Sequence, residues 1–145
     1  MRLDFSGRQV IVTGGTRGIG AAISAAFLEA GAAVTATYLG NEAAAEAFRA
    51  AHAGRPLATV RCDVADQAAV ESFYAEFDRT HAALDVLVNN AGIRRDGVVG
   101  MLAPSDWQAV IATHLTGTFL MSKGALLKML QHRRGRIITI TSPSG

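Results

Sequence analysis

Short apolar runs alternate with longer segments of helical periodicity along the whole chain. Five runs have the length and composition of buried strands, and we expect strands near Gln9–Thr13, Ala33–Tyr38, Leu57–Cys62, Asp85–Asn89 and Arg136–Thr141. Between the strands, apolar residues recur every third or fourth position, as helices require. This alternation predicts right-handed βαβ crossovers. The fold class is therefore α/β, a doubly wound parallel sheet in three α/β/α layers, whose last predicted element is the fifth strand.

The longest helical pattern follows Ser105. The run from Ser105 to Gln108 has the form of a capping box and predicts the start of a helix, and Gly135 is the predicted stop. We expect one apolar stripe along this helix, formed by Trp107, Ile111, Leu115, Phe119, Leu126 and Met129. Further apolar positions lie outside the stripe, at Leu120, Leu127 and Leu130. Because the sheet can cover only one side, the helix needs a second partner.

Composition limits the class of protein. With 145 residues, half of them apolar, we expect residues 1–145 to form a single globular domain. The net charge of +2 does not indicate a nucleic-acid-binding protein, and no apolar run is long enough to span a membrane. Met1–Gly7 does not resemble a signal peptide, and the single cysteine, Cys62, fits a reducing compartment. We therefore expect a cytoplasmic protein. The four scattered histidines and the single cysteine have no ligand spacing, so we expect no metal site.

A glycine-rich segment, Thr13-Gly14-Gly15-Thr16-Arg17-Gly18-Ile19-Gly20, lies between the first strand and the first helix. Glycine allows the backbone to turn tightly and to approach a ligand without a Cβ in the way. The helix that follows points its free N–H groups at that ligand, which suits a pyrophosphate. A glycine pattern between a strand and a helix predicts a dinucleotide-binding turn.

The residues around this turn favour NADP over NAD. A site for NAD usually carries an acid about 20 residues beyond the glycines, where it binds the ribose 2′-hydroxyl. Here the second strand ends at Tyr38 with no acid before Glu42, whereas Arg17 lies inside the turn and can pair with a 2′-phosphate. The alternative is that Arg17 is an ordinary solvated side chain and that Glu42 folds back to the ribose.

A second motif, Asn89-Asn90-Ala91-Gly92, directly follows a buried strand. Together with the glycine turn, it resembles the short-chain dehydrogenase/reductase family, whose fold is Rossmann-like. The run from Asn89 to Asp96 and the later Gly135-Arg136-Ile137-Ile138 are most similar to the 3-oxoacyl-[acyl-carrier-protein] reductases within it. The resemblance implies that Asp63 contacts the adenine with Val64 beside it, and that Asn90 and Gly92 pass the adenosine ribose. The implied NADP(H)-binding set is Gly14, Thr16, Arg17, Gly18, Ile19, Gly20, Tyr38, Asp63, Val64, Asn90, Ala91 and Gly92.

Ser142 follows the fifth strand and is the candidate catalytic residue. The resemblance implies that its hydroxyl hydrogen-bonds the substrate carbonyl, while a tyrosine delivers the proton and a lysine lowers the pKa of that tyrosine. The family's Tyr-x-x-x-Lys would lie about a dozen residues beyond Ser142, past Gly145. Without the family, Ser142 could simply satisfy backbone groups at the strand end. We expect these residues to be the N-terminal part of a longer reductase.

His114 stands where the family usually has an asparagine that holds a water in the proton path. Histidine can donate and accept hydrogen bonds, so His114 is a second catalytic candidate, and a buried structural histidine is the alternative. The run His132-Arg133-Arg134, with Lys128 one turn earlier, forms a basic cluster at the end of the long helix. It complements the helix dipole, and Arg133 and Arg134 could also contact an acidic acyl carrier protein.

Two functions from different classes remain. The first is NADPH-dependent reduction of a ketone, with a 3-oxoacyl thioester on acyl carrier protein as the expected substrate and another small ketone or a sugar as the alternative. The second is a catalytically incomplete nucleotide-binding subunit that assists an active partner. In either case the second apolar face of the long helix must be covered, and the family resemblance implies that a second copy of the chain covers it, in a homo-oligomer that we expect to be a tetramer.

Overall fold

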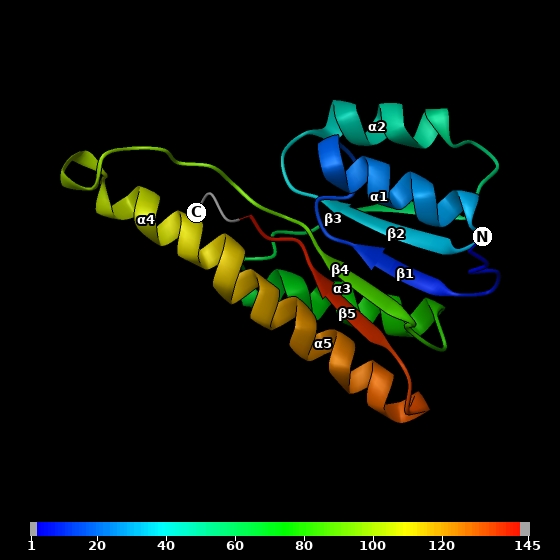
Figure 1. Ribbon diagram of the computed structural model, residues 1–145. Helices are drawn as coiled ribbons and strands as arrows, with labels where there is room; N and C mark the ends of the chain where they lie inside the picture. The colour runs from blue at the N-terminus through cyan, green and yellow to red at the C-terminus, as the bar shows by residue number, and fades with distance from the viewer. Residues whose placement is uncertain (1–2, 143–145) are drawn as a thin grey trace.

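The computed structural model describes residues 3–142, which form a five-stranded sheet between two layers of helices (Figure 1). The strand order is β3-β2-β1-β4-β5 and every neighbouring pair is parallel. The strands are β1 (Gln9–Val12), β2 (Ala33–Tyr38), β3 (Leu57–Arg61), β4 (Val86–Asn89) and β5 (Arg136–Thr139). The helices are α1 (Gly18–Glu29), α2 (Glu42–Ala51), α3 (Gln67–Thr80), α4 (Pro104–Ile111) and α5 (Gly117–His132).

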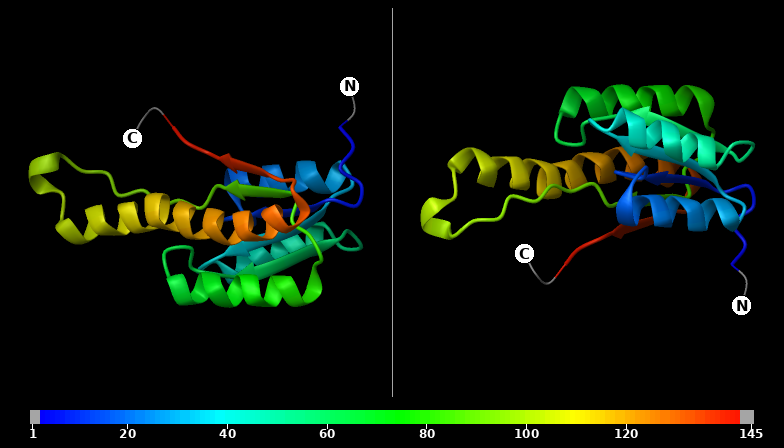
Figure 2. Two further views of the ribbon diagram at one scale, coloured as in Figure 1. Left: turned by 90° about the horizontal axis from the view of Figure 1, so that it is seen from below. Right: turned by 90° about the horizontal axis from the view of Figure 1, so that it is seen from above.

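Alternate residues of the central strands enter two separate cores. Val10 and Val12 of β1 pack with Leu28 of α1 on one face of the sheet, whereas Ile11 packs on the other face with residues of α3 and α5. Figure 2 shows the sheet between these two helical layers. The predicted α/β class, with a doubly wound parallel sheet in three layers, is therefore confirmed. Each predicted strand contains the observed one, although β5 ends at Thr139 rather than at Thr141.

The strand order changes direction between β1 and β4, because the chain first builds outward to β2 and β3 and then returns to the other side of β1. Ligands on sheets of this kind bind outside the carboxyl ends of the strands at that point. The glycine-rich turn leaves the carboxyl end of β1, and Asn90 to Gly92 leave the carboxyl end of β4. The topology therefore brings the two motifs together.

The start and stop signals of the long helix differ from the prediction. The helix begins at Pro104 with Ala103 as its N-cap, and no side chain caps it, so the predicted capping box at Ser105 is wrong. Proline at the first helical position has its φ already set and lacks only an N–H that would be unpaired anyway. At the other end the helix stops at His132, where Arg133 adopts the left-handed conformation with φ 52°, two residues before the predicted Gly135.

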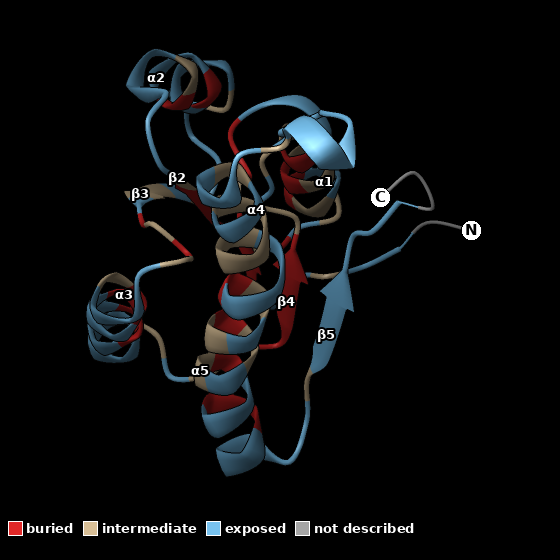
Figure 3. Cartoon of the chain, turned by 90° about the vertical axis from the view of Figure 1, so that its left-hand side faces the viewer, coloured by how far each residue is buried: buried red, intermediate tan, exposed pale blue. Residues whose placement is uncertain are grey.

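The predicted apolar stripe of this helix is mainly its exposed side. Most members of the stripe point away from the sheet, namely Trp107, Leu115, Phe119 and Leu126, and only Met129 is buried. In Figure 3 the side of α5 that faces the viewer is mainly pale blue. The side that packs inward combines two small residues, Gly117 and Ala125, with the longer side chains of Met121, Lys128 and Met129. A Cβ on Gly124 would collide with the ring of Tyr74, which illustrates this close packing.

Candidate cofactor-binding site

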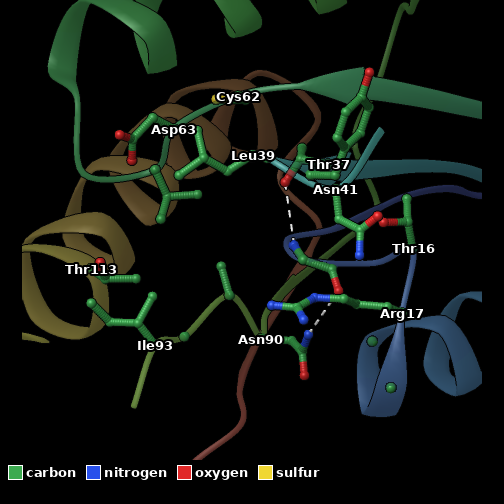
Figure 4. A pocket seen from close by; sticks show the side chains of 18 of the residues that line it. Thr16, Arg17, Thr37, Leu39, Asn41, Cys62, Asp63, Asn90, Ile93 and Thr113 are labelled. Atoms are coloured by element: carbon green, nitrogen blue, oxygen red, sulfur yellow. Dashed lines mark hydrogen bonds between the residues drawn. The ribbon is translucent and has the colours of Figure 1, made fainter. Parts of the chain in front are cut away.

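A cavity of about 640 Å³ opens at the carboxyl edge of the sheet. Five parts of the chain line it: the turn after β1 with the first residues of α1, the end of β2 with the loop up to Asn41, the segment Cys62–Val64, the segment Asn90–Ile93, and Thr113. Figure 4 shows the side chains of these segments around one space. All twelve residues of the predicted cofactor-binding set are among those that line this cavity. The sequence motifs, far apart along the chain, therefore meet at one site, although their individual roles stay predictions.

The glycine-rich turn is shaped by steric requirements at its glycines. Gly14 and Gly18 have φ values of 60° and 54°, which residues with a Cβ rarely adopt. A Cβ on Gly20 would collide with the carbonyl oxygen of Gly14, so α1 can begin this close to the turn only with glycine there. Arg17 is the N-cap of α1 but its side chain makes no capping hydrogen bond. No side-chain cap therefore occupies the N-terminus of α1 beside the cavity, as anion binding there requires.

Thr13 joins the two motifs. Its hydroxyl oxygen accepts hydrogen bonds from the backbone N–H groups of Asn90 and Ala91, both at 2.9 Å. The Asn90 side chain completes the connection by donating to the carbonyl oxygens of Thr13 at 3.0 Å and Gly14 at 3.2 Å. The amide of Asn90 therefore braces the glycine turn. The side chain of the preceding Asn89 instead donates to the Ser122 hydroxyl of α5 at 3.0 Å.

The Thr13 contacts were missed by the sequence analysis, which used Thr13 only as the start of the glycine motif. A signal was present, because a hydroxyl residue directly after a buried strand often binds nearby backbone groups. The sequence could not show which backbone groups these are, since Asn90 and Ala91 lie 77 and 78 positions away.

Arg17 is exposed and lines the cavity (Figure 4). Glu42, the acid that could have favoured NAD, is occupied: the Tyr38 hydroxyl donates to its carboxylate, with O–O distances of 2.8 and 2.9 Å. This hydrogen bond raises the pKa of Tyr38 above its ordinary value, because the carboxylate stabilises the protonated hydroxyl. Arg17 is therefore the charged group of the turn that faces the cavity, while the Glu42 carboxylate is held outside it.

Asp63 and its neighbours form the wall opposite the glycine turn. One carboxylate oxygen of Asp63 accepts a hydrogen bond from the N–H of Ala65 at 2.9 Å, which fixes the side chain in a tight turn before α3. Val64 packs against α5, where a Cβ on Gly117 would come within 2.8 Å of it. Burial, reinforced by nearby carboxylates, raises the pKa of the Cys62 thiol to about 11, so the thiol stays protonated near neutral pH.

His114 lies in a π-helical segment, Ala112–Thr116, that connects α4 to α5. Its Nε2 is 2.8 Å from the carbonyl oxygen of Ile93 and 3.1 Å from the Ile93 nitrogen, so either tautomer of the ring has a partner. The ring also packs on Gly92, where an added Cβ would lie 2.6 Å from it. Through these contacts with Ile93 and Gly92, His114 supports the loop after β4 that lines the cavity. Segments of π-helix are frequent at functional sites, but the part of His114 in a proton relay stays a prediction.

Ser142 is the last described residue and is exposed, three positions beyond β5. Because β5 runs parallel to β4, Ser142 leaves the sheet at the same carboxyl edge as the cavity. It is not among the residues that line the cavity. Its catalytic role stays a prediction.

The predicted basic cluster at the end of α5 is divided by the structure. Lys128 points inward, with its Nζ 2.5 Å from a carboxylate oxygen of Asp78 and 5.7 Å from the centre of the Phe77 ring. Arg134 pairs with the buried Asp85 at 3.2 Å. Within the described range 3–142, Arg133 makes no ion pair. Lys128 is therefore a structural cation that joins α5 to α3, which separates it from the predicted basic cluster at the end of the long helix.

Two kinds of feature are absent from the described part of the chain. In residues 3–142, no three or more His, Cys, Asp or Glu side chains are grouped so that they could hold a metal ion. Each helix in the same range is too short or too polar to cross a lipid bilayer.

Comparisons with known proteins define the class. The family model for short chain dehydrogenases matches residues 8–145, so the chain belongs to the short-chain dehydrogenase/reductase family. It is 42% identical over 138 residues to the acetoacetyl-CoA reductase of Shinella zoogloeoides, covering 95% of this chain and 56% of that protein. It is 36% identical over 143 residues to the 3-oxoacyl-[acyl-carrier-protein] reductase FabG of Escherichia coli, covering 99% of this chain and 58% of that protein.

The fold agrees with a solved structure of a putative gluconate dehydrogenase from Agrobacterium tumefaciens, with a TM-score of 0.91 and 30% identity. That match covers 98% of this chain and 56% of the other. The chain thus spans just over half the length of the relatives it matches.

Proposed function

We propose that this chain is the NADPH-binding part of a reductase that converts a 3-oxoacyl thioester to the 3-hydroxy product. The observation that carries the proposal is the cavity at the switch point, where the glycine turn, the loop after β4 and Arg17 meet. Similarity to an acetoacetyl-CoA reductase and to 3-oxoacyl-[acyl-carrier-protein] reductases supports the substrate class. We propose that the reductase is a soluble, cytoplasmic protein, which fits this assignment.

Each part of the cavity has a role in this proposal. The N–H groups at the start of α1 receive the pyrophosphate, and Arg17 pairs with the 2′-phosphate. Asp63 contacts the adenine. A bound nicotinamide would supply the hydride, and Ile93 would line the cavity beside the cofactor. Ser142 orients and polarises the ketone carbonyl, where donors aimed at the developing oxyanion give a large share of catalysis.

The proposal is tested on the full-length protein with purified substrates. We expect NADPH-dependent reduction of acetoacetyl-CoA and of 3-oxoacyl-[acyl-carrier-protein], followed by the loss of NADPH absorbance. The likeness to a putative gluconate dehydrogenase makes oxidation of gluconate with NADP⁺ the relevant comparison. Turnover of gluconate without turnover of either thioester would reject the substrate class and keep the cofactor assignment.

Replacing Arg17 by alanine should weaken NADPH binding and leave NADH binding nearly unchanged. Loss of a charge-assisted hydrogen bond to the 2′-phosphate costs about 1.5–3 kcal/mol, which corresponds to roughly tenfold to hundredfold in Kd. Titration of both cofactors by fluorescence measures the two effects. Arg17→Lys is the matched control, because it keeps the charge but loses the bidentate geometry of the guanidinium. Its Kd for NADPH should lie between those of the wild type and Arg17→Ala. Equal weakening of both cofactors would contradict the role of Arg17.

The outer face of the α4–α5 helix supports the proposal of a homo-oligomer, with a tetramer as the expected state. Phe119, Leu127 and Leu130 are each about 60% exposed, and large apolar patches usually mark interfaces. Leu127→Glu should therefore split the assembly with little effect on the fold of each subunit. Light scattering at micromolar concentration measures the result, and Ala50→Glu, which adds a charge on the exposed side of α2, is the charge control. Leu120 is less suitable, because it packs against the core. A wild-type protein that is monomeric would contradict this prediction.

A contact with acyl carrier protein is proposed at Arg133 and Arg134. Arg133 is exposed at the end of α5, whereas Arg134 shares Asp85 with Arg8. Of the two, Arg133 has the greater freedom to meet an acidic partner, and its charge would mainly raise the association rate.

A further inference from the structure

Tyr38 and Glu42 form a pair at the end of the cavity that holds Arg17. Tyr38 is the last residue of β2 and lines the cavity, and Glu42 is the first residue of α2, just beyond the cavity-lining Asn41. This end of β2 is tied to the glycine turn, since the N–H of Gly15 donates to the carbonyl oxygen of Thr37 at 2.9 Å. Figure 4 shows Asn41 on the same side of the cavity as Thr16 and Arg17. The carboxylate of Glu42 is therefore within one short loop of the site assigned to the 2′-phosphate.

The Glu42 carboxylate is held by a hydrogen bond from a single side-chain group, the Tyr38 hydroxyl, which a substitution can remove. Both Glu42 oxygens lie within 2.9 Å of the single hydroxyl of Tyr38, and the charge also sits favourably at the N-terminus of α2. The Asn41 side chain caps this helix by accepting from the N–H of Ala44 at 2.9 Å, so the loop itself is well held. The direction of the Glu42 side chain, and not the path of the backbone, is what the tyrosine hydroxyl decides.

The two cofactors respond oppositely to a carboxylate at this place. A carboxylate that reaches the ribose accepts a hydrogen bond from the free 2′-hydroxyl of NADH, but repels the 2′-phosphate of NADPH. If the carboxylate is turned away, NADPH escapes the repulsion and NADH loses the hydrogen bond. Cofactor specificity, which is the difference between the two binding free energies, therefore shifts toward NADPH.

We propose that the Tyr38 hydroxyl determines cofactor preference by holding the Glu42 carboxylate away from the 2′-position of the adenosine ribose. This inference rests on the proposed NADPH site beside Arg17, and it assigns Tyr38 a positioning role that acts through Glu42.

The test is a double-mutant cycle on the full-length protein, with Tyr38→Phe, Glu42→Gln and both changes together. Phenylalanine keeps the ring and removes only the hydroxyl. Kd values for NADPH and NADH are measured by fluorescence titration, and thermal unfolding checks the fold of every variant. With Glu42 present, Tyr38→Phe should raise the Kd for NADPH about fivefold at low salt, and lower the Kd for NADH. With glutamine at position 42, the same change should affect neither Kd.

Added salt gives a readout that a merely structural role would not move. The effect of Tyr38→Phe on NADPH should shrink as ionic strength rises, because it comes from repulsion between exposed charges. An unchanged ratio of the two Kd values in Tyr38→Phe, or a change that persists in the Glu42→Gln background, would overturn the inference. Failure of the proposed function is seen separately: a wild-type preference for NADH, or no effect of Arg17→Ala, rejects the NADPH site, whereas the cycle reports only the coupling of Tyr38 to Glu42.

Discussion

Replacing Thr13 by valine is expected to lower the free energy of unfolding by about 2–4 kcal/mol, because two backbone N–H groups lose their acceptor. These N–H groups belong to Asn90 and Ala91, and within residues 3–142 the Thr13 hydroxyl is their acceptor. Valine fills the same space, so the loss comes from hydrogen bonding rather than from a cavity. Denaturant unfolding of both proteins measures the difference.

The same change should also weaken cofactor binding, since the Thr13 hydroxyl holds the glycine turn against the loop after β4. We expect the Kd for NADPH to rise about tenfold, which corresponds to a loss of slightly more than about 1 kcal/mol in the free energy of binding. Thr13→Ser is the matched control, because it keeps the hydroxyl and loses one methyl group, and it should bind NADPH nearly as the wild type does. A valine variant with wild-type stability would show that water replaces the hydroxyl.

The polypeptide Met1–Gly145 on its own is expected to reduce no ketone above background, even with saturating NADPH. In these 145 residues, neither tyrosine is followed by a lysine four positions later. Glu42 follows Tyr38 at that spacing, and Asp78 follows Tyr74. Tyr74 cannot substitute, since it is buried and its hydroxyl donates to the carbonyl oxygen of Met121 at 2.7 Å. Loss of a general acid costs roughly 10²–10⁴-fold in rate.

The full-length protein, assayed in parallel, is the control for this experiment. A shift in thermal unfolding with NADPH shows whether the polypeptide 1–145 binds cofactor. In the full-length protein, Ser142→Ala should lower kcat about a hundredfold with little change in the Kd for NADPH. Turnover by the polypeptide alone would show that the tyrosine is replaced. A full-length protein that binds NADPH but reduces none of the ketones would favour the alternative, a nucleotide-binding subunit that assists an active partner.

The fold could be predicted from the sequence because its signals are local. The β-branched run Gln9–Val12 and the glycines after it mark a strand and a tight turn without any knowledge of their neighbours. The same holds for Val86–Asn89 and the Asn-Asn-Ala-Gly motif that follows. Once these elements alternate with helices, handedness and parallel pairing place both motifs at one edge. The position of the cavity followed from that placement alone.

The inward side of the α4–α5 helix could not be predicted in this way. Large apolar residues such as Phe119 and Leu126 indicated a core stripe, yet they are exposed in this subunit. The buried side of α5 combines Met121 and Met129 with small residues, and Gly117 and Gly124 have no room for a Cβ beside Val64 and Tyr74. Periodicity reports that a helix has apolar faces, but it does not say which face meets the sheet and which meets another partner.

The sequence by itself determined the class, the order of the elements and the residues that gather around the cavity, because strand and turn preferences act over a few neighbouring residues. Only the tertiary structure decided how those residues are paired. The hydroxyl of Thr13 binds the backbone at Asn90, and the Lys128 cation turns inward to Asp78. Tyr38 holds Glu42, only four positions away, because the chain turns between β2 and α2. Each pairing depends on where a side chain finds its partner in space, which the three-dimensional arrangement of the elements sets.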